Sequence, residues 1–446
     1  MSGSTPGSFS PTSPSTHPAF AARTRGMTAS EIRALFSVAS RPEVVSLAGG
    51  MPFVSALPLD AVGAVISDLV ASRGAAALQY GSGQGDPRLR EQICTVMAAE
   101  SIAADPDDVV VTVGSQQALD LVSRVFLDPG DVVLAEAPSY VGALGTFAAA
   151  EAEVRHVAMD DEGLVPAALG EALGRVEADG RRAKLLYTVP AFHNPAGVCL
   201  AEGRRAEILA IAAAHGVLVL EDNPYGLLGF DGEPVPALRA ADDGVLYLGT
   251  FSKTFAPGFR VGWVLAPQAA REKLVLANEA ITLCPPTFSQ MAVTAYLETQ
   301  PWREQIKDYR ELYRERRDAL LQSLDALLPR SVPSLSWTRP AGGFYVWVTL
   351  PDGLDAKAML PRAIAERVAY VPGTAFYADD SGAQHLRLSY CYPTPDRIRE
   401  GVRRLAAVLE QEIELHNTFG AGAGRALPPG HRAGASRTDA PGPELA

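Results

Sequence analysis

Y-L-G-T-F-S-K-T-F-A-P-G-F-R-V-G-W, residues 247–263, is the stretch that decides how the chain folds. The apolar run 245–248 predicts a buried strand, and a second short strand ends at Val264. The polar turn between them contains Lys253 among hydroxyl groups and small residues, an unusual place for a charge that only meets solvent. A lysine removed from water loses its proton readily and becomes an imine-forming nucleophile. These residues alone leave open whether Lys253 is such a nucleophile or an exposed turn lysine.

The run G-T-F-S-K-T-F-A-P-G-F-R, residues 249–260, resembles the lysine region of fold-type I aminotransferases that use pyridoxal 5'-phosphate (PLP). The resemblance is to the branch of 2-aminoadipate and kynurenine aminotransferases. In that family the lysine carries the cofactor as a Schiff base, a role that falls here to Lys253. The arginine seven positions later, Arg260, is implied to bind the cofactor phosphate. The similarity runs from about residue 27 to about residue 409, which is most of the chain.

Length and composition limit the class of protein. With 446 residues, 47% of them hydrophobic and 20% charged, the chain has room for one large domain and a smaller one. The net charge of −12 and the lack of a Lys/Arg block argue against nucleic-acid binding. No apolar run approaches the roughly 20 residues that span a bilayer, so we expect no membrane insertion. The four cysteines lack C-x-x-C spacing, which indicates reduced thiols in a cytoplasmic protein, and no metal site is predicted.

Strand-like and helical runs alternate through the first part of the chain, which predicts an α/β fold with a mostly parallel sheet wrapped by helices. We expect strands at 109–113, 132–136, 154–159, 184–188 and 217–221, and helices at 115–126, 140–149, 164–177 and 202–215. Long helices then appear, and the later elements are a helix at 302–328, strands at 343–350, 370–371 and 386–389, and a helix at 395–409. This change of pattern predicts a second, smaller α+β domain.

Five segments follow from these patterns. Residues 1–26 are a leader, 27–65 a segment that the resemblance places with the small domain, 66–285 the large cofactor-binding domain, 286–413 the small domain, and 414–446 a tail. The leader is rich in Ser, Thr and Pro without an acidic residue, and the tail is rich in Gly, Ala and Pro. Such compositions predict disorder, so we expect no chemistry from either end.

A phosphate site is predicted after the strand at 109–113. The next residues are G-S-Q-Q, so the free N–H groups of Ser115 and Gln116 lie at a helix N-terminus, where anions bind. Ser115 alone is equally consistent with a simple N-cap. The run G-S-Q-Q-A-L-D-L resembles the family's phosphate motif, and the resemblance adds three further ligands: Thr250, Ser252 and Arg260. It also matches Tyr80 to a tyrosine that reaches the phosphate from a second subunit, which implies a homodimer; on its own, Tyr80 reads as a core aromatic.

A site for the cofactor ring is predicted after the strand at 217–221. Asp222 stands at the carboxyl end of that strand, where ligands of α/β sheets bind, although such an aspartate is often only a turn former. In the resembled family this carboxylate faces the pyridine nitrogen and keeps it protonated, which makes the ring an electron sink. The resemblance also implies that Asn194 and Tyr225 bind the phenolic oxygen of the ring and that Tyr140 stacks on the ring.

Three residues are candidates for contact with the substrate. Arg387, in H-L-R-L-S-Y, resembles the family arginine that clamps the substrate α-carboxylate, and the alternative is a structural salt bridge. The resemblance matches Gly50, in L-A-G-G-M-P, to one of a pair of glycines that let the backbone approach the substrate. Arg33 matches an arginine that binds a distal carboxylate in some relatives, which suits glutamate and 2-oxoglutarate; a surface ion pair is equally consistent. The loop 51–58 departs from the family pattern, so it leaves the side-chain pocket open. Several aromatic residues are either pocket or ordinary core: Phe53, Tyr80, Phe192, Phe288 and Phe376.

The resemblance implies ping-pong transamination, in which an L-amino acid gives its amino group to the cofactor and a 2-oxo acid takes it up. Lys253 would move the proton between the substrate Cα and the cofactor carbon. A PLP-dependent lyase, racemase or decarboxylase uses the same cofactor residues, and a non-catalytic aminotransferase-like regulator domain is a further alternative. An NAD-linked dehydrogenase is disfavoured because the glycine-rich run 81–85 does not follow a strand in the required spacing. The amino donor stays open among aminoadipate, kynurenine, leucine-like, aromatic and arylglycine compounds.

Overall fold

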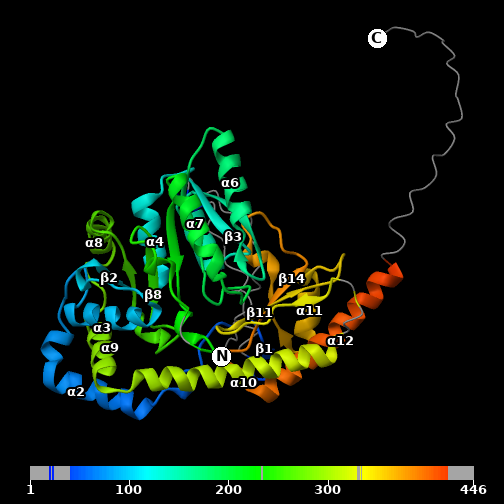
Figure 1. The fold of residues 1–446 in the computed structure, drawn as a ribbon. Coiled ribbons are helices and arrows are strands. Elements are labelled where there is room, and N and C mark those ends of the chain that lie inside the picture. Colours follow the sequence, from blue (N-terminus) through cyan, green and yellow to red (C-terminus); the bar gives the residue numbers. More distant parts are fainter. Residues whose placement is uncertain are drawn as a thin grey trace, which may run out of the picture.

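The computed structural model describes residues 41–232, 235–328 and 334–419, together with residues 20, 21, 23, 24 and 332. These residues form an eight-stranded sheet covered by helices and a separate four-stranded sheet with helices of its own (Figure 1). The predicted fold class, a large α/β domain with a mostly parallel sheet plus a smaller α+β domain, is confirmed.

The large sheet has the strand order β2-β9-β8-β7-β6-β3-β4-β5. Its strands are β2 (Val109–Thr112), β3 (Val132–Ala137), β4 (Glu153–Asp160), β5 (Gly163–Leu164), β6 (Ala183–Thr188), β7 (Leu218–Asp222), β8 (Leu246–Thr250) and β9 (Gly262–Leu265). The inner strands β8, β7, β6, β3 and β4 pair in parallel, whereas β9 runs antiparallel to both β2 and β8. Strands buried on both faces need continuous apolar runs, which the sequence supplies in β2, β3 and β8.

Helices cover both faces of the large sheet. One face packs against α4 (Ser115–Phe126), α5 (Val141–Ala149) and α8 (Gln268–Thr282). The other packs against α6 (Pro166–Ala178) and α7 (Glu202–Ala214). Near the β2 edge, α2 (Leu59–Ala77), α3 (Pro87–Met97) and α9 (Thr287–Thr299) pack together. The crossover helices leave the carboxyl ends of the parallel strands free at one edge.

The small sheet is antiparallel, with the order β10-β11-β14-β13. Its strands are β10 (Ser336–Trp337), β11 (Tyr345–Thr349), β13 (Val371–Pro372) and β14 (His385–Ser389), and its helices include α11 (Ala356–Ala365) and α12 (Pro395–Phe419). A parallel pair of short strands, β1 (Val45–Ser46) and β12 (Val368–Ala369), ties the N-terminal segment to this part. Helix α10 (Trp302–Leu327) packs against α12 and runs along the bottom of the view beneath both parts (Figure 1).

Two predicted elements differ from the structure. Helix α12 continues to Phe419, beyond the predicted end at residue 409, so residues 414–419 are helix where a tail was predicted. The continuation is held by apolar packing of Ile413 and by an ion pair between Glu412 and Arg362. The strand predicted at 370–371 is two short strands, β12 and β13, which pair with different partners. The rest of the tail and nearly all of the leader lie outside the described residues, and the domain borders stay predictions.

Candidate active site

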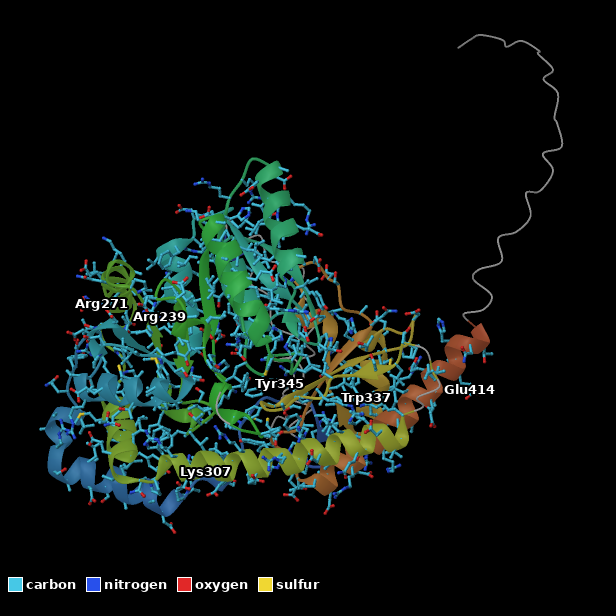
Figure 2. The ribbon with its side chains drawn as sticks, in the orientation of Figure 1. Arg239, Arg271, Lys307, Trp337, Tyr345 and Glu414 are labelled. Atoms are coloured by element: carbon cyan, nitrogen blue, oxygen red, sulfur yellow. The ribbon has the colours of Figure 1, made fainter. Side chains whose placement is uncertain are left out.

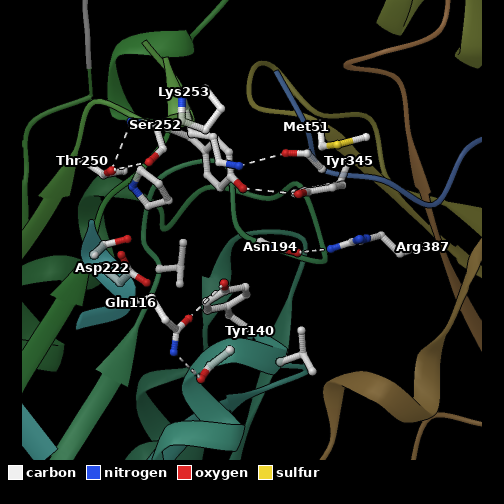
Figure 3. A pocket seen from close by; sticks show the side chains of 18 of the residues that line it. Met51, Gln116, Tyr140, Asn194, Asp222, Thr250, Ser252, Lys253, Tyr345 and Arg387 are labelled. Carbon is white, nitrogen blue, oxygen red and sulfur yellow. Dashed lines mark hydrogen bonds between the residues drawn. The ribbon is translucent and has the colours of Figure 1, made fainter. Parts of the chain in front are cut away.

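A pocket of about 430 Å³ lies where the large sheet meets the small domain (Figure 3). Five strands of the large sheet direct their carboxyl ends toward it: β2, β3, β6, β7 and β8. In open α/β sheets ligands bind at this edge, and here the loops after these strands supply most of the lining. Twelve predicted site residues line the pocket: Gly50, Ser115, Gln116, Tyr140, Asn194, Asp222, Tyr225, Thr250, Ser252, Lys253, Arg260 and Arg387.

Two predicted site residues do not line this pocket. The side chain of Tyr80 is 76% exposed and lies outside the pocket of its own chain. Arg33 falls within residues 25–40, outside the described part of the chain. The roles predicted for both residues therefore stay predictions.

Lys253 occupies the turn between β8 and β9, and its amine faces the pocket (Figure 3). The Nζ atom donates a hydrogen bond to the Gly50 carbonyl oxygen at 2.8 Å. Burial lowers the pKa of Lys253 from 10.5 to about 8, and the positive charge of Arg387 contributes in the same direction. The neutral, nucleophilic amine is therefore far more abundant near pH 7 than for an ordinary lysine.

Asp222 ends β7 with its carboxyl group buried at 3% exposure. Its Oδ2 atom accepts a hydrogen bond from the Tyr187 hydroxyl at 2.9 Å, while the buried Oδ1 atom has no partner among the described residues. Burial raises the pKa of Asp222 to about 6, although Tyr187 and then Lys253 act to lower it. A buried carboxylate oxygen without a donor is costly, so this position fits the N–H of a protonated pyridine ring.

The end of the pocket that is predicted to bind phosphate is formed by the N-terminus of α4 and the guanidinium of Arg260. A Cβ on Gly114, which has φ +74°, would lie 2.4 Å from Arg260 Nη2, and a Cβ on Gly262 would lie 2.6 Å from the Ser115 nitrogen. The two glycines thus allow β9 and Arg260 to approach the first turn of α4. Arg260 donates to the Val113 carbonyl oxygen at 3.2 Å. Unsatisfied N–H groups at a helix N-terminus beside a cation fit a phosphate.

The hydroxyl groups of the lysine turn complete this end. Thr250 Oγ1 donates to Ser252 Oγ at 2.9 Å, and Arg260 Nη1 lies 3.5 Å from the same Ser252 oxygen. Gln116 is held from the other side, because its Nε2 donates to the Gly142 carbonyl oxygen at 3.1 Å. The Tyr140 hydroxyl lies 3.3 Å from Gln116 Oε1, so the ring of Tyr140 borders the space beside the phosphate end.

Arg387 lies on β14 with its side chain 2% exposed. Its guanidinium donates to Asn194 Oδ1 and to the Ala48 carbonyl oxygen, both at 2.8 Å, and lies 4.1 Å over the ring of Tyr345. The Nε atom has no acceptor, and no carboxylate pairs with Arg387 within the residues that the structure describes. A buried cation without a counter-charge fits an anionic ligand group, which is a carboxylate in an amino acid.

Tyr345 is a lining residue that sequence reasoning missed. Its ring lies where the two parts meet, whereas Lys307 and Glu414 lie on outer helices (Figure 2). Its hydroxyl lies 3.4 Å from the Tyr225 hydroxyl, and a Cβ at Gly50 would lie 2.1 Å from it. The sequence alone could not place Tyr345 in the site, because its position depends on the pairing of strands that are distant in sequence. Strand β11, which carries Tyr345, pairs with β14, the strand that carries Arg387.

The aromatic residues that the sequence left open between pocket and core do not line the pocket. Phe192 and Phe376 are buried in the core, and the ring of Phe53 packs under the guanidinium of Arg316 at 4.1 Å. Phe288 lies on α9 and packs in the apolar cluster between α9 and α2 instead. Met51, from the loop that departs from the family pattern, does line the pocket.

Three further observations concern only the residues that the structure describes. No helix among the described residues is long and apolar enough to cross a membrane. The same residues hold no group of three metal-ligating side chains. The cysteines, all within the described ranges, are free: Cys94, Cys199, Cys284 and Cys391.

Known proteins match nearly the whole described chain. Residues 43–405 match the family model described as aminotransferase class I and II. Aromatic-amino-acid aminotransferase 1 of Thermococcus litoralis is 42% identical over 398 residues, which cover 89% of this chain and 95% of the relative. The crystal structure of kynurenine aminotransferase from Pyrococcus horikoshii with PMP is 39% identical with a TM-score of 0.85, covering 90% of this chain and 98% of that one.

A third relative was crystallised with a ligand that joins a phosphopyridoxyl group to an amino acid. The crystal structure of LysN, the α-aminoadipate aminotransferase of Thermus thermophilus, contains N-(5'-phosphopyridoxyl)-L-leucine. It is 37% identical with a TM-score of 0.82, and the match covers 89% of this chain and 99% of that one. The unpaired Asp222 oxygen, the amine of Lys253 and the anion site beside Arg260 fit the same type of group. The chain therefore belongs to the class I and II aminotransferases and is a PLP-dependent aminotransferase of fold type I.

Proposed function

We propose that this enzyme transfers the amino group of an L-amino acid to a 2-oxo acid, with glutamate and 2-oxoglutarate as one pair, by a ping-pong mechanism. The observation that carries the proposal is Arg387, a buried guanidinium that faces the pocket without a carboxylate partner among the described residues. Amino acids and 2-oxo acids share an α-carboxylate, so one clamp serves both half-reactions. A single site that alternates between the two substrates is what a ping-pong mechanism needs.

The residues around the pocket have distinct tasks in this reaction. When bound, PLP withdraws electrons from the bond to the substrate Cα. The Asp222 carboxylate holds a proton on the ring nitrogen, which keeps the ring electron-poor. The Lys253 amine, with a pKa of about 8, takes the proton from Cα and returns it as a general base and acid. Asn194 holds the guanidinium of Arg387, so the α-carboxylate and the reacting Cα are oriented together.

For the amino donor we propose side chains that are aromatic or long and apolar. Beside the Arg387 guanidinium the pocket is lined by Tyr345, and Met51 also lines the pocket. Relatives are named for aromatic amino acids, kynurenine and aminoadipate. The positively charged side chains of the described lining are Lys253, Arg260 and Arg387. Each already has a proposed role with the cofactor or the α-carboxylate, so a second carboxylate on the substrate side chain would need Arg33. We keep Arg33 as the proposed ligand of that group in glutamate or 2-oxoglutarate.

We further propose a cytoplasmic homodimer in which Tyr80 reaches the phosphate bound to the second subunit. Tyr80 and Leu78 are 76% and 75% exposed, although tyrosine and leucine of this size usually bury much of their surface. Light scattering should therefore give a mass of twice 47.1 kDa. In that dimer, Tyr80→Phe should weaken PLP binding without dissociating the subunits. A monomer with full PLP affinity would contradict the proposal.

A single-turnover experiment tests the proposed reaction. Purified holoenzyme is mixed with each member of a panel of L-amino acids, and the absorbance of the bound cofactor is followed with Lys253→Ala as the control. We expect the cofactor to convert to its amino form with aromatic donors, and steady-state rates with 2-oxoglutarate to give parallel double-reciprocal lines. Release of carbon dioxide, of ammonia, or of racemised amino acid in place of 2-oxo acid would support decarboxylase, lyase or racemase activity instead. No reaction with any donor would favour a regulator.

A further inference from the structure

Glu100 is a buried acid that the roles above leave unexplained. It ends the 3-10 helix Ala98–Glu100 after α3, and its side chain is 3% exposed. Its Oε1 atom accepts from Asn223 Nδ2 at 3.0 Å, and its Oε2 atom lies 2.5 Å from the Tyr247 hydroxyl. Burial raises the pKa of Glu100 to about 8, against the opposing effect of the Tyr247 hydrogen bond, so the carboxyl group is mainly neutral at pH 7.

The two partners of Glu100 lie on the segments that carry the catalytic groups. Asn223 directly follows Asp222, and its Oδ1 atom accepts from the Gly226 nitrogen at 2.9 Å, which closes the turn that contains Tyr225. Tyr247 lies on β8, the strand that leads into the turn of Lys253. Glu100 therefore links Asn223, which follows β7, to Tyr247 within the adjacent strand β8. Both strands end in residues that line the pocket, Asp222 in β7 and Thr250 in β8.

The packing around this contact is tight. A Cβ on Gly226 would lie 1.8 Å from Glu100 Oε1 and 2.7 Å from Asn223 Oδ1, so only glycine fits there. A small cavity of about 10 Å³ borders Glu100, Tyr247 and Thr250, the last of which belongs to the phosphate end. The turn after β7 is therefore held in place by Glu100, and a smaller side chain at position 100 would leave room for it to move.

We propose that Glu100 is a positioning residue for transamination: through Asn223 and Tyr247 it sets the positions of Asp222 and of the lysine turn relative to the cofactor. Its side chain is not among the residues that line the active-site pocket. The inference rests on the PLP site and is independent of which amino donor the enzyme uses, so failure of the proposed donor class would leave it intact.

The test compares Glu100→Ala with Glu100→Gln in the full-length holoenzyme. The alanine variant should shift the pH midpoint of the bound cofactor's absorbance by about half a unit or more and lower kcat about ten-fold, with KM changed less than about three-fold. It should also raise the dissociation constant of PLP about ten-fold, because Asn223 and Tyr247 lose their shared partner. Glutamine should restore these values, since its amide can accept from Asn223 and donate to Tyr247.

Glu221→Gln is the matched control. Glu221 is equally buried and neighbours Asp222 in sequence, but its carboxylate accepts from the backbone nitrogens of Leu238 and Arg239. This variant should lower the unfolding temperature without moving the absorbance midpoint. An absorbance midpoint and kcat at wild-type values in a folded Glu100→Ala protein would overturn the proposal, as would failure of the glutamine variant to restore them.

A milder variant and a double mutant separate positioning from folding. If the alanine variant does not fold, Tyr247→Phe removes only the contact between Tyr247 and Glu100. It should shift the pH midpoint of the cofactor absorbance in the direction expected for Glu100→Ala, by a smaller amount. Where the alanine variant folds, Glu100→Ala combined with Asn223→Ala should lower kcat by less than the product of the two single losses, because both variants remove the contact between Glu100 and Asn223. Independent, multiplying losses in kcat would overturn the proposal.

Discussion

Replacing Tyr187 by phenylalanine tests how the Asp222 carboxyl is kept ionised. The Tyr187 hydroxyl donates to Asp222 Oδ2 at 2.9 Å in a fully buried setting, where the pKa of Asp222 is already raised to about 6. A hydrogen bond to a charged group contributes roughly 1.5–3 kcal/mol, and one pKa unit corresponds to about 1.4 kcal/mol. Loss of the hydroxyl should therefore raise the pKa of Asp222 by about one to two units, to about 7 or 8. At pH 7 the ionised fraction then falls from about nine-tenths to a half or less.

The assay is PLP binding to cofactor-free protein, measured by absorbance titration at a series of pH values. Ionised Asp222 favours the protonated ring nitrogen, so PLP affinity should fall on the acid side with a midpoint that follows the pKa of Asp222. We expect the midpoint in Tyr187→Phe to move up by about one unit or more. Tyr309→Phe is the control, because the Tyr309 hydroxyl is buried, has no partner in the described structure and lies outside the pocket. A midpoint that stays within about 0.3 unit of wild type would refute the reasoning.

Four further predictions concern single groups. Arg387→Ala should raise KM for the amino donor about a hundred-fold, or roughly 3 kcal/mol, with PLP affinity unchanged. An equal rise in KM for amines that lack a carboxylate would contradict the role of Arg387 as the carboxylate clamp. Gly114→Ala should weaken PLP binding in equilibrium dialysis about ten-fold or more, because its Cβ would lie 2.4 Å from Arg260 Nη2. The rate of PLP attachment to cofactor-free enzyme should rise with pH around a midpoint near 8, the pKa of Lys253; a midpoint near 10.5 would show an ordinary amine. Finally, the pKa of Glu100 is about 8 when folded and 4.5 ordinarily, so the native state holds a proton that the unfolded chain releases. The unfolding temperature of the cofactor-free protein should thus fall as pH rises from about 5 to 8, less steeply in Glu100→Gln, and a rise over that range would contradict the assignment.

The fold could be predicted because its signals are local. Continuous apolar runs of four to six residues that alternate with helical periods predict parallel strands with crossover helices, and helix α4 begins and ends where the sequence placed it. Such sheets bind ligands at the carboxyl ends of their strands, so residues such as Asp222 and Ser115 were expected to meet. The end of α12 was not predictable in this way, because contacts with distant residues such as Arg362 extend it.

The residues that sequence reasoning missed depend on pairing across strands. Tyr187 meets Asp222 because β6 and β7 are neighbours in the sheet, and Tyr345 meets Arg387 because β11 pairs with β14. Glu100 is separated from Asn223 by more than a hundred residues, and no local pattern connects them. The sequence also could not decide whether aromatic residues such as Phe192 line the pocket or the core. Composition shows that Phe192 is apolar, but not which side of the backbone its ring faces.

Transfer of a labelled amino group tests the central claim most directly. Holoenzyme is incubated with 15N-labelled L-phenylalanine and 2-oxoglutarate, and the products are identified by mass spectrometry beside Lys253→Ala. The proposed function predicts one 15N-glutamate for each phenylpyruvate formed, and neither product with the variant. Phenylpyruvate with free 15N-ammonia, or no labelled glutamate from any donor although PLP is bound, would contradict it.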